Sequence, residues 1–381
     1  MSGEPPQAVT IVAHDVGSVG GMEHQLGELI AGLRRRGHPV TVIAWKCVLE
    51  DGVDAEVHIV GGPRRPFPVG YLSFLVRGSL AVRRHRRGLV QTTGAIVLNR
   101  VDVLAVHCCH QVYRAAPRRE GALYRAYESI VGLMKRVGER VIVERNRRAA
   151  IVCVSEGVAD EMREHYPRAA GRVLAIHNGV DTEAFRPGGA RERARGLRAS
   201  SGIAPERLVA SFVARGWGHK GLGQLIEALA QAPAWDLLVA GSGDERSYRS
   251  LAERAGVADR VHWVGVVSDV QTVYEASNAF VLPSSYETFS LVTFEAAATG
   301  VPVLATDVNG VRELVNDGTT GFIIRREADD IARRLNDLAG DPQLRERVGA
   351  AAREAALAFS WERMVDRHVA VYGALAARRS G

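Results

Sequence analysis

Short apolar runs alternate with helical stretches along most of the chain, and glycine-rich turns lie between many of them. An apolar run at 8–13 precedes helical spacing at 22–33, and Gly37 ends that helix before a β-branched run at 40–44. This strand, helix and strand form a βαβ unit, which implies a parallel sheet with right-handed crossovers. The same pattern continues along the chain. Apolar runs follow at 101–106, 150–154 and 173–176, and a helical stretch lies between the first two at 123–148.

The alternation stops after Phe185 and restarts near residue 208. Residues 186–205 are rich in Gly, Pro, Ala and Arg, so we expect a linker between two domains at the start of this stretch. A second series follows, with expected strands at 208–213, 236–240, 261–264, 279–282, 302–305 and 321–324 and expected helices at 222–230 and 289–298. The sequence therefore predicts an α/β chain of two Rossmann-like, doubly wound parallel-sheet domains, residues 1–186 and 187–358, which agrees with its 381 residues. Such a pair usually holds a ligand in the cleft between the domains.

Composition excludes several other classes of protein. Hydrophobic residues make up 46% of the chain and charged residues 24%, which supports buried cores and rules out disorder as the main state. No stretch reaches the roughly 18 uncharged apolar residues of a membrane span, and the N-terminus has no leader pattern. The four cysteines contain no C-x-x-C pair, which argues against a disulfide framework or a zinc site, so we expect a cytoplasmic protein.

Positive charge is concentrated in the first half of the chain. Net charge is +6, and a cluster of arginines at 83, 84, 86 and 87 follows the apolar stretch 71–82. A helix on a membrane surface and a solvated helix end are both compatible with this pattern. Peripheral contact with the inner face of a membrane is therefore one expectation. Nucleic acid is not an expected partner, because the aromatic interleaving and the known binding modules are missing.

Three glycine turns offer backbone N–H groups to an anion, at 17–21, 215–221 and 241–243. None matches G-x-G-x-x-G or the phosphate-binding P-loop, which disfavours a nicotinamide dehydrogenase. The second turn adds Arg215 and Lys220, which would neutralise the charge that grows on a departing diphosphate. Alternatively, both are solvated surface charges.

Glu287 and Glu295 lie eight residues apart, on either side of a helix start expected at 288–290. The free N–H groups of that first turn can hold phosphate oxygens. Glu287 would then face a sugar, and Glu295 would accept hydrogen bonds from ribose hydroxyls. The alternative is that both acids only complement the helix dipole.

Together these segments resemble the family 4 retaining glycosyltransferases of GT-B fold. The resemblance rests on PSSYETFSLVTFEAAATGVPVLAT, on Asn178-Gly179-Val180-Asp181 before Phe185-Arg186-Pro187, on FVARGWGHKG, and on GGMEHQLGELIAGLRRRGHPVTV. It implies two domains facing across a cleft, with the C-terminal helix 359–381 returning to the N-terminal domain. It also implies a nucleotide-diphosphate sugar as donor, with no metal ion and no other cofactor.

The resemblance assigns roles to matching residues. In the donor domain, Arg215 and Lys220 would hold the diphosphate, Glu287 the sugar hydroxyls and Glu295 the ribose. The backbone at Phe289, Ser290, Leu291 and Val292 would hold the phosphates. In the N-terminal domain, the expected residues near the donor are Gly20, Gly21 and His107.

Two positions depart from the family pattern, because Ala297 replaces a frequent methionine and Ser290 a frequent glycine. Among the histidines, His107 ends an apolar run where the cleft should be, although a packed core histidine is the alternative. We expect His110 and the adjacent Cys108 and Cys109 to serve packing.

The expected function is therefore a retaining, metal-independent transfer of a sugar to a hydroxyl acceptor. The acceptor would be a glycan, a lipid-linked molecule or a small molecule, recognised by the N-terminal domain. Alternatives are a GT-B epimerase or phosphorylase, and a non-catalytic protein that binds nucleotide sugars.

Overall fold

The computed structural model describes residues 6–17, 20–113 and 122–380. The chain forms two compact units, Met1–Gly179 with Trp361–Gly381 and Val180–Ser360. The second unit begins a few residues before the domain start expected at 187. Both units are α/β, as the sequence predicts.

The first unit contains a seven-stranded sheet in the order β5-β3-β1-β6-β7-β8-β9, and every pair in it is parallel. The chain winds outward from β1 through β3 to β5 and then returns to the other side of β1. The carboxyl ends of β1 and β6 therefore meet at a switch point, where α/β sheets bind ligands. The strands are β1 (Val9–Val12), β3 (Val40–Ala44), β5 (Glu56–Ile59), β6 (Leu89–Thr93), β7 (Val103–Val106), β8 (Ala150–Cys153) and β9 (Val173–Ala175), and a small separate sheet pairs β2 (Asp15–Val16) with β4 (Lys46–Cys47).

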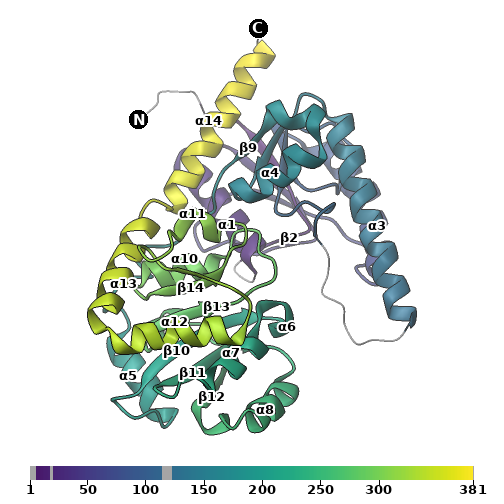
Figure 1. Ribbon diagram of the computed structural model, residues 1–381. Coiled ribbons are helices and arrows are strands. Elements are labelled where there is room, and N and C mark those ends of the chain that lie inside the picture. Colours follow the sequence, from purple (N-terminus) through teal and green to yellow (C-terminus); the bar gives the residue numbers. More distant parts are fainter. Residues whose placement is uncertain (1–5, 18–19, 114–121, 381) are drawn as a thin grey trace. The chain divides into compact units, whose positions relative to one another are not determined.

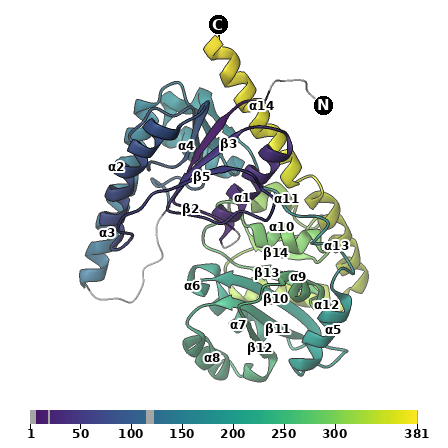
Figure 2. The same ribbon diagram turned by 180° about the vertical axis from the view of Figure 1, so that it is seen from behind.

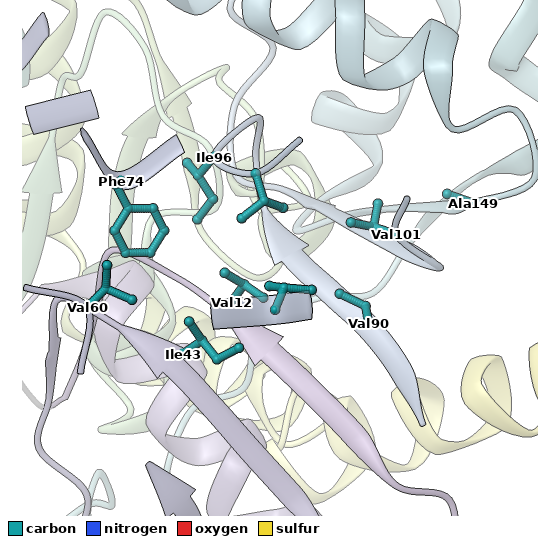
Figure 3. Close-up of a cluster of buried hydrophobic side chains, with 10 residues drawn as sticks. Val12, Ile43, Val60, Phe74, Val90, Ile96, Val101 and Ala149 are labelled. Carbon is teal, nitrogen blue, oxygen red and sulfur yellow. The ribbon is translucent and has the colours of Figure 1, made fainter. Parts of the chain in front are cut away.

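Helices cover this sheet and bury its apolar side chains. They are α1 (Gly21–Arg35), α2 (Phe67–His85), α3 (Ala122–Arg145), α4 (Glu156–His165), the 3-10 helix η1 (Pro167–Arg172) and α14 (Trp361–Ser380). Phe74 of α2 is fully buried against Val12 and Ile43 of the sheet, with Ile96 beside them (Figure 3). Within the described residues, every helix is too short or too polar to cross a bilayer.

The last helix, α14, belongs to the first unit although the second unit separates it from the rest in sequence. Arg36, the residue that follows α1, pairs with Asp366 of α14 at 2.7 Å. The hydroxyl of Tyr372 donates to Oε1 of Gln91 in β6 at 2.7 Å, and both residues are buried. These contacts anchor α14 along the first unit (Figure 1).

Sequence analysis did not anticipate β5 and β6. The sequence of β6 is LVQTT, and polar residues at three of five positions hide a strand that is buried at the sheet centre. Gln91 is tolerated there because Tyr372 satisfies its side-chain oxygen. β5 is an edge strand whose alternate residues are exposed, so it lacks a continuous apolar run.

The second unit contains a six-stranded parallel sheet in the order β12-β11-β10-β13-β14-β15. Its chain also winds outward in one direction, returns, and continues in the other, so its switch point lies between β10 and β13. The strands are β10 (Leu208–Arg215), β11 (Trp235–Ser242), β12 (Val261–Gly265), β13 (Ala279–Leu282), β14 (Val303–Thr306) and β15 (Phe322–Ile324). Figures 1 and 2 show β10, β11, β13 and β14 side by side.

Helices also surround the second sheet. They are α5 (Arg191–Ser200), α6 (Trp217–Lys220), α7 (Leu222–Leu229), α8 (Glu245–Arg254), the 3-10 helix η2 (Ala258–Arg260), α9 (Val270–Glu275), α10 (Leu291–Ala298), α11 (Val311–Leu314), α12 (Ala328–Gly340) and α13 (Pro342–Ala356). Helix α5 occupies much of the stretch whose beginning we expected to be a linker.

A glycine lets the two central loops of this unit approach each other. Gly221, between α6 and α7, has φ 85, and a β-carbon there would overlap the carbonyl oxygen of Pro283 after β13. A side chain at this position would therefore be strained by its backbone conformation and by this contact.

We expect Gly221→Ala to lower the free energy of unfolding by about 3 kcal/mol, from left-handed strain and from the steric overlap. Gly256→Ala is the matched control, because Gly256 has φ 67 but open space around its β-carbon position. That control should cost only about 1 kcal/mol. Urea denaturation of both variants measures the difference, and equal losses would contradict the close approach.

Candidate functional site

Two loops of the second unit meet at the switch point between β10 and β13. β10 ends at Arg215, whose side chain is exposed, and the short helix α6 follows. The loop 283–290 follows β13 and leads into α10. Because β10 and β13 are adjacent and parallel, both loops leave the same edge of the sheet.

Lys220 and Glu287 form an ion pair across these loops. Nζ of Lys220 lies 2.6 Å from Oε1 of Glu287, and the side chains are only 19% and 8% exposed. The hydroxyl of Ser284 donates to the same carboxylate oxygen at 2.7 Å. A nearly buried pair of charges is expensive to desolvate, and such hydrogen bonds offset part of that cost. The structure thus brings two predicted site residues into direct contact.

Arg326, which sequence reasoning did not single out, ties the two loops together. Its guanidinium donates to the carbonyl oxygens of Pro283 at 3.0 Å and Gly218 at 2.8 Å. The backbone N–H of Ser285 also donates to the carbonyl oxygen of His219 at 2.8 Å. The only sequence signal for Arg326 is its place shortly after the last strand.

Helix α10 begins in a strained conformation. Ser290 caps it with φ 70 and ψ 60, and among the described residues it is the only non-glycine with positive φ. Its hydroxyl lies 2.8 Å from the hydroxyl of Thr293, and the preceding Phe289 stacks on Phe294 with ring centroids 4.2 Å apart. The expected helix start at 288–290 is therefore slightly early. The first turn of α10 presents backbone N–H groups that have no acceptor within the helix.

Glu295 lies on the second turn of α10 and contacts a different helix. The hydroxyl of Tyr274 in α9 donates to Oε2 of Glu295 at 3.0 Å. Burial raises the pKa of Glu295 to about 7, and the hydrogen bond from Tyr274 opposes this shift. The carboxyl is consequently poised between its charged and neutral forms near neutral pH.

Arg215 remains without such a partner. Within the part of the chain that the structure describes, its guanidinium forms no ion pair or side-chain hydrogen bond. An exposed cation without an ion-pair partner, at the same sheet edge as the Lys220–Glu287 pair and the loop that leads into α10, suits an anionic ligand.

The remaining predicted residues lie in the first unit. Gly20 caps α1 with φ 104 and Gly21 is the first residue of that helix, while Ser18 and Val19 of the same turn are outside the described residues. His107 follows β7 and its Nε2 lies 3.3 Å from Oε1 of Gln25.

Burial and the neighbouring His368 lower the pKa of His107 to about 4. Its imidazole is therefore neutral at physiological pH, where it can exchange hydrogen bonds but carries no charge. Cys109 is buried, as its expected packing role requires, and burial also lowers the pKa of His110 to about 4.

A group of possible metal ligands appears elsewhere in the first unit. Side-chain atoms of Glu56, His58 and His85 lie within 4.8 Å of one another. Sequence spacing gave no sign of this group because it joins an edge strand to the end of α2. The ring centroids of the two histidines are 3.8 Å apart, and Arg87 forms an ion pair with the carboxylate of Glu56 at 3.1 Å. These contacts therefore also contribute to packing.

Each half of the chain matches a known family of glycosyltransferases. Residues 19–184 match the family described as Glycosyltransferase Family 4, and residues 195–355 match the family described as Glycosyl transferases group 1. The chain is 34% identical over 255 residues to a D-inositol 3-phosphate glycosyltransferase of Streptomyces avermitilis, covering 62% of this chain and 54% of the relative. It is 31% identical over 242 residues to an alpha-maltose-1-phosphate synthase of Mycobacterium tuberculosis, covering 58% of this chain and 62% of the relative. The matches thus span just over half of these relatives.

The solved structure of sucrose-phosphate synthase from Thermosynechococcus elongatus shares the fold. Its TM-score is 0.81 at 23% identity, covering 98% of this chain and all of that chain. The expected two-domain α/β architecture is therefore confirmed.

The strain at Ser290 predicts a difference between two substitutions. Ser290→Gly and Ser290→Ala both remove the contact with Thr293, but only glycine adopts φ 70 without steric cost. We expect the glycine variant to be more stable than the alanine variant by about 1 kcal/mol in chemical denaturation. Equal stabilities would show that Ser290 carries no backbone strain.

The pKa of Glu295 predicts a pH-dependent effect on stability. The pKa of Glu295 is about 7 in the folded chain, whereas the ordinary pKa of a glutamate side chain is 4.5. Ionisation is thus less favourable in the folded state, and the stability contributed by this group falls as the pH rises between these values. We expect Glu295→Gln to gain stability relative to the natural chain across this window, with little gain below it.

Urea denaturation at a series of pH values measures this effect. The matched control is Glu253→Gln, which changes an exposed glutamate on α8 of the same unit. A gain in Glu295→Gln that did not vary with pH would contradict the raised pKa.

Proposed function

Because this chain belongs to the family 4 glycosyltransferases of GT-B fold, we propose that it transfers a sugar from a nucleotide-diphosphate sugar to a hydroxyl acceptor. We propose further that the anomeric configuration is retained and that no metal ion takes part. The matched relatives from Streptomyces and Mycobacterium are named a D-inositol 3-phosphate glycosyltransferase and an alpha-maltose-1-phosphate synthase, which supports this class of activity.

The contact between Lys220 and Glu287 is the observation on which the proposal chiefly rests. It places a cation for phosphate and a carboxylate for sugar hydroxyls 2.6 Å apart at the switch point of the second sheet. A nucleotide sugar carries phosphates and sugar hydroxyls next to each other, so it would offer a partner to each of the two side chains. An ion pair without a ligand role would add little to the stability of the fold, because burying both charges costs desolvation energy.

The diphosphate would lie against Arg215, Lys220 and the first turn of α10. Arg215 is exposed and able to bind two phosphate oxygens, and Lys220 has further N–H donors besides the one facing Glu287. The backbone N–H groups from Phe289 to Val292 would add donors at the positive end of the helix. These groups are in place before reaction, so they stabilise the charge that develops on the departing diphosphate. They would supply the positive charge that a divalent metal ion provides in other enzymes.

The two glutamates would bind the hydroxyls of the donor. Glu287 uses Oε1 for Lys220 and Ser284, and its other oxygen can accept from a sugar hydroxyl. Glu295 would accept from ribose hydroxyls, which favours its charged form over the neutral one. Donor binding should therefore release a proton from Glu295 near neutral pH.

Retention would follow from attack on the same face that the diphosphate leaves. Glu287 and Glu295 are assigned to binding hydroxyls in this route, so neither would act as a nucleophile. The departing phosphate would instead accept the proton of the acceptor hydroxyl. No covalent intermediate with the protein is required in this route.

The first unit would supply the acceptor side. Gly20 and Gly21 open α1 with a backbone free of side chains, which permits close approach of a diphosphate. His107 would contact the donor sugar as a neutral imidazole, through hydrogen bonds rather than charge. The acceptor would be a glycan, a lipid-linked molecule or a small molecule with a free hydroxyl.

Removing either cation should slow the reaction. We expect Arg215→Ala and Lys220→Ala each to lower kcat by about 100-fold or more, because the leaving diphosphate loses a positive partner. The measurement follows release of nucleotide from UDP-, GDP- and ADP-sugars, with water or an added hydroxyl compound as acceptor.

Arg215→Ala is the cleaner variant, because it leaves the pair of Lys220 with Glu287 intact. Arg195→Ala on α5 is the matched control, since Arg195 is exposed in the same unit and away from the switch point. Near-normal turnover in both site variants would contradict the role in leaving-group stabilisation. Absence of release from all three classes of donor would contradict the proposed function itself.

A further inference from the structure

Helix α2 carries an apolar stripe on its outer surface. Val69, Leu72, Val76 and Leu80 recur at the spacing of one helix face. All four are between 48% and 58% exposed, whereas Phe74 and Val82 on the opposite side of the helix are fully buried. The helix is therefore apolar on the side facing the core and apolar on the side facing out.

Helix α3 carries a matching stripe. Ile130, Leu133, Val137 and Val141 have the same spacing, and each is at least half exposed. The two helices lie side by side on the first unit, as Figure 2 shows. We call the surface formed by these eight residues the α2–α3 face.

A groove runs along this face between the helices. Its volume is about 420 Å³, and its walls include Tyr71 and Leu75 of α2 and Leu133 and Val137 of α3. Val97, in the connection between β6 and β7, also lines the groove. Most of its lining residues are apolar, which suits a hydrocarbon chain better than a sugar or a nucleotide.

The charges around the face are almost all positive. Helix α2 contains no Asp or Glu, and Arg83 and Arg84 continue its apolar stripe at the carboxyl end. Arg145 borders the groove from the end of α3. The exposed charged residues of the two helices are six arginines and a single glutamate, namely Arg77, Arg83, Arg84, Arg125, Arg140, Arg145 and Glu144.

We propose that the α2–α3 face docks onto the surface of an anionic lipid bilayer, with the groove accepting an acyl chain. Two exposed apolar stripes with a cationic border complement a layer of hydrocarbon beneath negative headgroups. Exposed apolar area of this extent is costly in water unless a partner covers it. Another protein surface would have to be both apolar and acidic to fit equally well.

The test is sedimentation of the full chain with lipid vesicles, which needs no sugar donor and is therefore independent of the proposed function. Vesicles contain either phosphatidylcholine alone or equal parts of phosphatidylcholine and phosphatidylglycerol. We expect binding to the anionic vesicles that weakens as salt is added, because salt screens the arginines. Binding to phosphatidylcholine alone should be at least about tenfold weaker.

Substitutions in each part of the α2–α3 face should weaken binding to the anionic vesicles by about tenfold. The apolar variants are Leu72→Ser with Val76→Ser, and Val137→Ser with Val141→Ser, and the charge variant is Arg83→Gln with Arg84→Gln. Controls in the second unit are Val266→Ser, an apolar residue 66% exposed, and Arg191→Gln with Arg195→Gln, two exposed arginines on α5. Thermal unfolding of every variant checks that the fold is kept.

The proposal is overturned if the natural chain does not sediment with anionic vesicles, or if the face variants bind as tightly as the controls. It is also overturned if the chain self-associates through this face, so that the apolar variants become monomeric in ultracentrifugation while lipid binding is absent.

Discussion

The parallel pairing of β10 with β13 is the constraint on which the candidate site depends. The chain leaves β10, builds two strands on one side, and returns to build three on the other. Two loops that are far apart in sequence therefore leave the same sheet edge without a strand between them. Lys220 and Glu287 meet there, and the same edge carries Arg215 and leads to the start of α10.

Holding these charges together carries a cost that the surrounding residues reduce. Glu287 is almost buried, and its carboxylate is satisfied by Lys220 and Ser284. Burial raises the pKa of Glu295 to about 7 although Tyr274 donates a hydrogen bond to it, and Ser290 opens α10 in a left-handed conformation. Unfavourable ionisation and backbone strain of this kind tend to concentrate at functional sites. The fold tolerates them because the strands beneath are buried and regular.

Much of the architecture could be predicted from apolar periodicity, since strands such as β3 and β13 begin and end where the sequence predicts. β6 could not be predicted in this way, because polar residues interrupt its apolar run and the partner of the buried Gln91 side-chain oxygen, Tyr372, is far away in sequence. The types of site residue were also predictable from glycine turns and paired acids. Arg326 was not, because its role depends on the carbonyl oxygens that the fold brings to it.

By itself, the sequence determined most of the strands and helices, the approximate division between the two sheets, and which charged residues lie beside glycine turns. These are local properties, set by side-chain spacing and backbone preference. Only the tertiary structure decided that Lys220 would pair with Glu287, that Arg36 and Gln91 would be the residues that fix α14 to the first unit, and that the stripes of α2 and α3 would lie side by side and exposed. Those outcomes depend on contacts between distant segments, and the spacing in a helix such as α2, which is apolar on two sides, does not reveal which side the rest of the chain will cover.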